Sequence, residues 1–354
     1  MCNTHAVTLR SKQRYDMMKR LQSVLVMMVA GTAVAAAQSP YIPNIHGTIR
    51  AKYEYQTEES EHRFEVRTAR VSIDGKIIEQ VSYKAEIDLS DEGNIKMLDA
   101  YARITPFSNF DITIGQMRVP FTIDAHRSPH QQYFANRSFI AKQVGNVRDV
   151  GLTVAYTFKG DIPITLQGGL FNGSGLTDQK DFWTDCINFS AKGQIFFPKG
   201  YNITLSVQKT KPGPATIMMY DAGAYYHGNG WHIEAEYLYK HYSHDAFDAV
   251  HAVDAFVSYD FPLKREKWLI KKITPLVRFD YMGDHSDGEE VDDDNNLVIT
   301  DYERKRITGG LTFSFSKPFT SDIRLNYEKY FYDSDDLAKT SEKDKIVLEL
   351  MVRF

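Results

Sequence analysis

The sequence predicts an all-β chain that crosses a membrane as one transmembrane antiparallel β-barrel of about 16 strands, with one loop folded into the lumen. Three observations carry this prediction. Segments in which apolar and polar residues alternate follow one another along most of the chain. They run for roughly nine to thirteen residues, longer than ordinary strands and long enough to cross a bilayer when tilted. Tight connections alternate with long ones, as the two ends of a membrane barrel require.

The start of the chain has the pattern of a secretory signal peptide. Two basic residues precede the apolar stretch LQSVLVMMVAGTAVAAA, which ends in small residues. We therefore expect residues 1–37 to be a signal peptide with a true start near Met17, and residues 38–354 to form the exported barrel. An anchoring helix is the alternative, but the apolar run is short and no basic stop-transfer flank follows it. A lipid anchor would need a cysteine at the cleavage point, and none is there.

Charge and cysteine content exclude further classes of function and of stabilising bond. The whole chain has a formal net charge of −4, and loss of the basic leader makes the remainder more acidic, so nothing indicates nucleic-acid binding. Cys186 is the one cysteine outside the leader. We expect it to stay a free thiol, because an exported chain with one cysteine has no internal disulfide. Its phase with Asn188, Ser190 and Lys192 predicts a lumenal position.

The first five strands are predicted at 47–56, 63–77, 80–90, 96–105 and 110–117. In the first of them, apolar Ile49 alternates with Arg50, which places the arginine on the lumenal face. In the second, the outward phase passes from Phe64 to Ala69. This shift predicts a β-bulge near Thr68.

The remaining strands are predicted at 147–158, 162–171, 184–197, 200–209, 216–227, 230–241, 249–260, 272–283, 301–315, 320–332 and 344–354. Aromatic pairs such as Tyr156 and Phe158 lie at strand ends, as in the aromatic girdles of membrane barrels. The last segment, KIVLELMVRF, alternates strictly and ends on Phe354. We interpret it as the closing strand and Phe354 as the signal that the outer-membrane assembly machinery reads. A closed barrel of this size leaves no backbone group unpaired in lipid and encloses a water-filled channel.

Three segments resemble the phosphate-selective porin O and P family. They are FEVRTARVSIDGKI, MLDAYARITPFSNFDITIGQMRVPFT and NVRDVGLTVAY, and the resemblance covers roughly residues 47–158. It implies a trimeric, sixteen-stranded bacterial outer-membrane porin with a loop folded into the lumen. The position that is lysine in the family's GQ.K.PF segment is Arg118 here, which keeps the positive charge.

The candidate site is the long segment 118–146, which exceeds the length of a plain connection. It has four basic residues against one acid, Asp124, and another cation follows on the next strand. The predicted loop and strand cations are Arg118, Arg127, Arg137, Lys142 and Arg148. Further cations continue the positive track along the wall: Arg50, Arg63, Arg67 and Arg70. Such a ring lowers the barrier for anions, and the guanidinium fork suits phosphate.

Other functions remain as alternatives. The arginines would only solvate a wet lumen if they pair with acids such as Glu86, and the protein would then be a general diffusion porin. An outer-membrane enzyme would need a constellation such as His241, Ser243, His244 and Asp245, which is more typical of a solvated loop. The run DDDNNLVITDYE resembles a calcium loop but has Leu297 where glycine is needed. We expect no catalytic activity, cofactor or metal, and as partners a homotrimer, outer-membrane lipid and lipopolysaccharide, the assembly machinery and small anions such as phosphate.

Overall fold

The computed structural model describes residues 41–144, 147–176, 179–264, 268–315 and 320–354. The first nine strands are β1 (Asn44–Gln56), β2 (Glu61–Ile78), β3 (Val81–Asp91), β4 (Asn94–Phe107), β5 (Phe110–Arg118), β6 (Arg148–Phe158), β7 (Ile164–Phe171), β8 (Asn188–Phe197) and β9 (Tyr201–Thr210). The others are β10 (Ile217–Gly228), β11 (Trp231–Tyr242), β12 (Val250–Tyr259), β13 (Phe261–Pro262), β14 (Ile270–Met282), β15 (Arg304–Phe315), β16 (Thr320–Tyr332) and β17 (Lys345–Arg353). Helical turns are few: η1 (Pro129–Gln131), α2 (Phe139–Gln143), η2 (Pro198–Gly200), η3 (Ser243–Asp245) and η4 (Thr340–Glu342).

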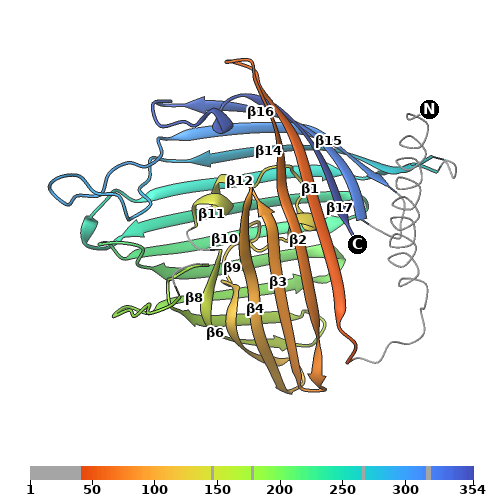
Figure 1. Ribbon diagram of the computed structural model, residues 1–354. Coiled ribbons are helices and arrows are strands. Elements are labelled where there is room, and N and C mark those ends of the chain that lie inside the picture. The colour runs from red at the N-terminus through yellow and green to blue at the C-terminus, as the bar shows by residue number, and fades with distance from the viewer. Residues whose placement is uncertain (1–40, 145–146, 177–178, 265–267, 316–319) are drawn as a thin grey trace, which may run out of the picture. The chain divides into compact units, whose positions relative to one another are not determined.

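The strands form a closed antiparallel barrel in chain order (Figure 1). The closure joins β1 to β17, in register from Thr48 opposite Arg353 to Gln56 opposite Lys345. The short β13 continues β12 after Asp260, and both pair with β14, so they make one crossing of the wall. The described residues therefore form a barrel of sixteen crossings, which confirms the predicted fold class.

The two ends of the barrel differ in their connections. One end, which we call the short-turn end, has tight connections such as residues 198–200 and 229–230. The other, the long-loop end, has the connections 119–147, 172–187 and 283–303. None of the helices among the described residues is long and apolar enough to span a membrane.

The strands alternate between an apolar outer face and a polar inner face, as predicted. On β11, Trp231 and Ile233 are exposed outside, whereas Glu234 and Glu236 are buried inside. The predicted bulge on β2 is also present, because the register shifts where Arg50 pairs with Thr68 and the next residue of β1 pairs with Val66.

The last residue closes the seam between β1 and β17. The Gly47 N–H donates to the Phe354 carbonyl at 2.8 Å, and the Phe354 N–H donates back at 3.0 Å. The aromatic ring lies over Gly47, where any larger side chain would collide with it. Recognition of Phe354 by the assembly machinery stays a prediction, and the predicted signal peptide lies outside the described residues.

The predicted strand 184–197 is wrong in its first four residues. β8 begins at Asn188, and Cys186 lies in the preceding loop rather than on a lumenal strand face. The Thr184 hydroxyl oxygen accepts a hydrogen bond from the Cys186 N–H at 3.0 Å, and this local contact competes with strand pairing. Cys186 is a free thiol, and the Lys209 Nζ lies 3.2 Å from its Sγ.

Candidate constriction site

The described part of the connection between β5 and β6, residues 119–144 and 147, folds into the barrel, and we call it the constriction loop. Its backbone reaches strands on the far side of the lumen. The Thr122 N–H donates to Ser206 on β9 at 3.1 Å. The Ala135 N–H donates to Asn326 on β16 at 2.9 Å. The predicted inward fold of this loop is therefore confirmed.

Apolar packing holds one side of the constriction loop. Phe139 and Ile140 of α2 are buried in a hydrophobic cluster with Met219 and Leu238 from the barrel wall. The helix is positioned by its N-cap, because Ser138 Oγ accepts the Ala141 N–H at 3.2 Å. We call the strands that hold the loop, β8–β17 and β1, the anchored wall. Among the described residues we find no hydrogen bond or ion pair from the loop to β2, β3 or β4, which we call the open wall.

Charged contacts reinforce the anchored side. Arg127 forms an ion pair with Glu234 on β11 and contacts Asp124 at 3.5 Å. Asp124 in turn accepts the backbone N–H and the hydroxyl of Ser138, each at 3.0 Å. Burial raises the pKa of Asp124, but Arg137 and Arg127 outweigh burial and lower that pKa to about 2. Asp124 is therefore a carboxylate at neutral pH, and it organises the loop around itself.

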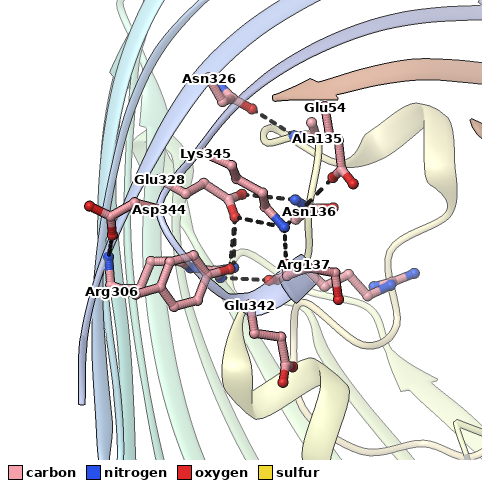
Figure 2. A network of polar contacts seen from close by, with 12 residues as sticks. Glu54, Ala135, Asn136, Arg137, Arg306, Asn326, Glu328, Glu342, Asp344 and Lys345 are labelled. Atoms are coloured by element: carbon pink, nitrogen blue, oxygen red, sulfur yellow. Dashed lines mark hydrogen bonds and ion pairs between the residues drawn. The ribbon is translucent and has the colours of Figure 1, made fainter. Parts of the chain in front are cut away.

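The tip of the loop is held by polar side chains of β14–β16, and Figure 2 shows those of β15 and β16. Asn136 donates to Glu328 at 3.0 Å, and Arg306 donates to the Arg137 carbonyl at 2.7 Å. Arg306 is fully buried, and it also pairs with Asp280 at 2.8 Å. On the other flank, Arg50 donates to the Ala135 carbonyl at 2.5 Å. The side chains of the wall thus fix the tip of the loop from both flanks.

Two of the predicted cations are held by carbonyl groups instead of carboxylates. Arg118 donates to the carbonyls of Ala125 at 3.0 Å and Arg127 at 3.1 Å. Arg137 donates to the carbonyl of Asp124 and, at 2.8 Å, to that of Arg127. Among the described residues, no carboxylate oxygen lies within ion-pair distance of either guanidinium. We call Arg118 and Arg137 the carbonyl-held pair.

Other cations surround the carbonyl-held pair. Burial, together with the charges of Arg50, Arg70 and Arg148, lowers the pKa of Arg137 to about 10, against the opposing effect of Asp124. These three arginines therefore lie within electrostatic reach of Arg137. Arg50, Arg70 and Arg148 are themselves paired with carboxylates, so Arg118 and Arg137 are the predicted cations here that have no ion-pair partner among the described residues.

The other seven predicted cations each have a carboxylate partner. The pairs are Arg50 with Glu349, Arg63 with Glu54 and Glu65, Arg67 with Asp91 and Glu92, Arg70 with Asp88 and Glu86, Arg127 with Glu234, Lys142 with Glu342, and Arg148 with Asp99 and Glu86. Most of these pairs neutralise charge locally. Arg50 in particular is buried, and its guanidinium donates to Glu349, Gln132 and the Ala135 carbonyl.

The buried arginines of the C-terminal strands were not among the predicted site residues. They are Arg278, Arg304, Arg306 and Arg324. The signal was present, because Arg324 alternates with apolar Leu325 in the same phase as Asn326 and Glu328. These arginines hold the loop or the wall, and no resemblance to a known motif pointed to them. Among the described residues, no group of three or more potential ligand side chains is arranged to bind a metal ion.

Comparison with known proteins places the chain in a family. The family model described as phosphate-selective porin O and P matches residues 43–257, more than half of the chain. No curated protein sequence matches it.

Solved outer-membrane proteins share the fold at low sequence identity. The anion-selective porin from Comamonas acidovorans is 10% identical with a TM-score of 0.61, over 88% of this chain and 98% of that one. Salmonella typhi OmpF, in a complex with daunomycin, is 12% identical with a TM-score of 0.60, over 89% and 98%. The DcaP channel of Acinetobacter baumannii is 14% identical with a TM-score of 0.57, over 88% and 97%. With the family match and the closed sixteen-stranded barrel, this chain belongs to the phosphate-selective porin O and P family and is a porin of the outer membrane.

Proposed function

We propose that this porin conducts small anions in preference to cations, along the space between the constriction loop and the open wall. The observation that carries the proposal is the carbonyl-held pair, Arg118 and Arg137. Their guanidinium groups are positioned by backbone carbonyls, which carry no net charge, so no carboxylate forms an ion pair with either of them, and the nearby Asp124 offsets the charge of Arg137 only in part. A positive constriction lowers the barrier for anions and raises it for cations.

Phosphate is the anion that the site suits best. An arginine presents a planar fork of N–H donors that binds two oxyanion oxygens at once, whereas a lysine acts as a point charge. The family is described as phosphate-selective and the similar Comamonas porin as anion-selective, and both likenesses support the same direction. The competing proposal is general diffusion without selectivity, and the seven carboxylate-paired cations favour it.

The test is the reversal potential of single channels in a potassium chloride gradient. We expect the double variant Arg118→Gln/Arg137→Gln to shift the reversal potential toward cation preference. The shift should be largest at low ionic strength, because the Debye length falls to about 8 Å at physiological salt. The matched control is Lys305→Gln/Lys329→Gln, which removes two positive charges from the outer face. An unchanged reversal potential in the first variant would leave general diffusion as the function.

A second variant separates phosphate recognition from simple anion preference. Arg118→Lys keeps the charge but loses the fork. We expect it to retain the chloride reversal potential and to lose part of the ratio of phosphate to chloride conductance. Equal loss of both properties would mean that Arg118 acts through charge alone.

We also propose the expected assembly and partners. The barrel is proposed to form a homotrimer in contact with outer-membrane lipid and lipopolysaccharide, after removal of residues 1–37 and insertion by the assembly machinery. One structural neighbour is described as a trimer form of a Vibrio cholerae outer-membrane protein, which supports the oligomer. Chemical crosslinking in native membranes would test it, and a single monomer band would exclude it.

A further inference from the structure

A second concave site lies in the lumen, between the tip of the constriction loop and the short-turn end. It is a cavity of ≈ 220 Å³. The loop contributes Tyr133 and His130, and the wall contributes His232, Lys272 and Arg324. The cavity does not contain the carbonyl-held pair.

One side of the cavity is aromatic. The rings of Tyr133 and His232 stack with centroids 4.5 Å apart and planes 25° apart. Tyr225 and Phe256 support His232 at 5.5 Å and 5.2 Å. These four rings come from the loop and from three neighbouring strands, and we call them the aromatic platform. His232 and Phe256 are buried, and of the four rings Tyr133 and His232 line the cavity. Half-buried Tyr133 is therefore the ring that the platform presents to the cavity.

The other side of the cavity is charged but balanced. Lys272 pairs with Asp260 at 2.9 Å, and Thr274 donates to the same carboxylate at 2.7 Å. Arg324 lies 3.7 Å from Asp322 and is also bound by Glu349 at 2.7 Å. Each cation in the lining therefore has an acid beside it, unlike Arg118 and Arg137 in the constriction.

The loop residues in the lining add no net charge at neutral pH. Burial and the neighbouring Arg353 lower the pKa of His130 to about 4, so this imidazole is neutral. Burial raises the pKa of Tyr133 to about 12, so its phenol keeps its proton and can donate a hydrogen bond. A charged ligand would find no unpaired opposite charge here, whereas a neutral ligand with many hydroxyl groups could share the existing donors and acceptors.

We infer that this cavity binds one ring of a neutral sugar. The C–H face of the sugar ring packs on the exposed part of Tyr133, which the rest of the aromatic platform holds in place, and its hydroxyl groups hydrogen-bond to the balanced charged side. Pockets that combine an aromatic surface with a few fixed polar groups are typical of small-molecule sites. The inference is independent of the anion preference, because it uses different residues on a different part of the lumen.

The test uses D-glucose in planar bilayers that contain the intact porin. Wild-type channels should show a saturable, concentration-dependent decrease of potassium chloride current when glucose is added. Tyr133→Leu removes the aromatic face but keeps apolar bulk, and we expect about tenfold weaker apparent affinity, the upper range for one aromatic contact. The matched control is Tyr220→Leu on the outer face, which should bind glucose as the wild type does.

A second variant protects the test against a loosened loop. Lys272→Leu changes the polar side from a strand, away from the constriction loop, and should also weaken the block by glucose. Both variants should keep the chloride conductance and the faster migration of unboiled protein, which show that loop and barrel are intact. If glucose leaves the wild-type current unchanged, or blocks all variants equally, the inference is wrong. A block by inorganic phosphate that Tyr133→Leu weakens as strongly as the glucose block would also overturn it.

Discussion

Arg127 and Arg137 lie ten positions apart in one loop, yet the two sides of that loop use arginine differently. Arg127 faces the anchored wall, where Glu234 neutralises it and Phe256 lies under its guanidinium at 5.7 Å. Arg137 is bound by two backbone carbonyls and keeps its charge. The partner therefore distinguishes the two arginines: a carboxylate neutralises Arg127, whereas the carbonyls that bind Arg137 form no ion pair with it, and our proposal assigns solute contact to Arg137.

The largest effect is expected at the centre of the anchored wall. Arg306→Ala removes one cation from two fully buried carboxylates, and it leaves Asp280 with Arg278 at 2.9 Å and Glu328 with Lys345 at 3.7 Å. Breaking a buried ion pair in this way costs about 3–5 kcal/mol. Urea unfolding followed by the migration of unboiled protein measures the loss. Lys305→Ala, the adjacent residue on the outer face, is the control and should change stability little; equal losses would contradict the distinction between the faces.

The second effect concerns the loop alone. Arg127→Gln leaves the buried Glu234 with only its contact to His232 at 3.0 Å, and truncating one partner of a buried charge pair costs about 2–5 kcal/mol. We expect the loop to detach transiently, which increases open-channel current noise and exposes the loop to proteases. Arg118→Gln changes the same charge without stranding a carboxylate, and its channels should stay quiet. Equal current noise in the two variants would show that the ion pair with the anchored wall does not hold the loop in place.

The same contrast explains which features of the structure could be predicted from the sequence. Period two and turn residues predicted the strands closely, because both are local properties of the backbone. The inward loop was predictable from its length and basic content. The partners of its arginines were not, since Glu234 lies 107 residues from Arg127 and no local pattern links them. Cys186 was misplaced because a hydroxyl contact two residues away delays the start of the strand.

The third effect is a pH dependence of the attachment of the loop to the anchored wall. The pKa of Asp124 is lowered to about 2 in the folded loop from an ordinary value of 3.8. A carboxyl group whose pKa is lowered on folding stabilises the folded loop at every pH above its pKa in the unfolded chain. This stabilisation is lost as the pH falls from about 4 toward 2, and the shift corresponds to about 2–3 kcal/mol. Current noise should therefore rise below about pH 4 in wild-type channels. Channels of Asp124→Asn should show increased current noise already at pH 7. Unchanged noise in this variant would show that Asp124 does not hold the loop on the anchored wall.

The smallest effect on ion selectivity is expected from a modification outside the anchored wall and the open wall. Cys186 lies in the loop before β8, half-buried beside Lys209. A water-soluble maleimide should label it in the native protein without changing ion selectivity, because the thiol is not in the constriction. Mass spectrometry measures the labelling, and reversal potentials measure the selectivity. A selectivity change on labelling would place this loop closer to the ion path than the barrel geometry indicates.

The seam between β1 and β17 has a consequence for the time order of folding. Its ion pair joins Arg50 to Glu349, which are 299 residues apart. Closing a chain of about 300 residues instead of a hairpin loop of about five costs roughly 3–4 kcal/mol more entropy. Neighbouring hairpins therefore form early, and the seam forms last. Until then two long strand edges remain open, and each can pair with the edge of another unfinished barrel. The risk of aggregation through open strand edges is therefore greatest just before the barrel closes, and it grows with the concentration of nascent chains.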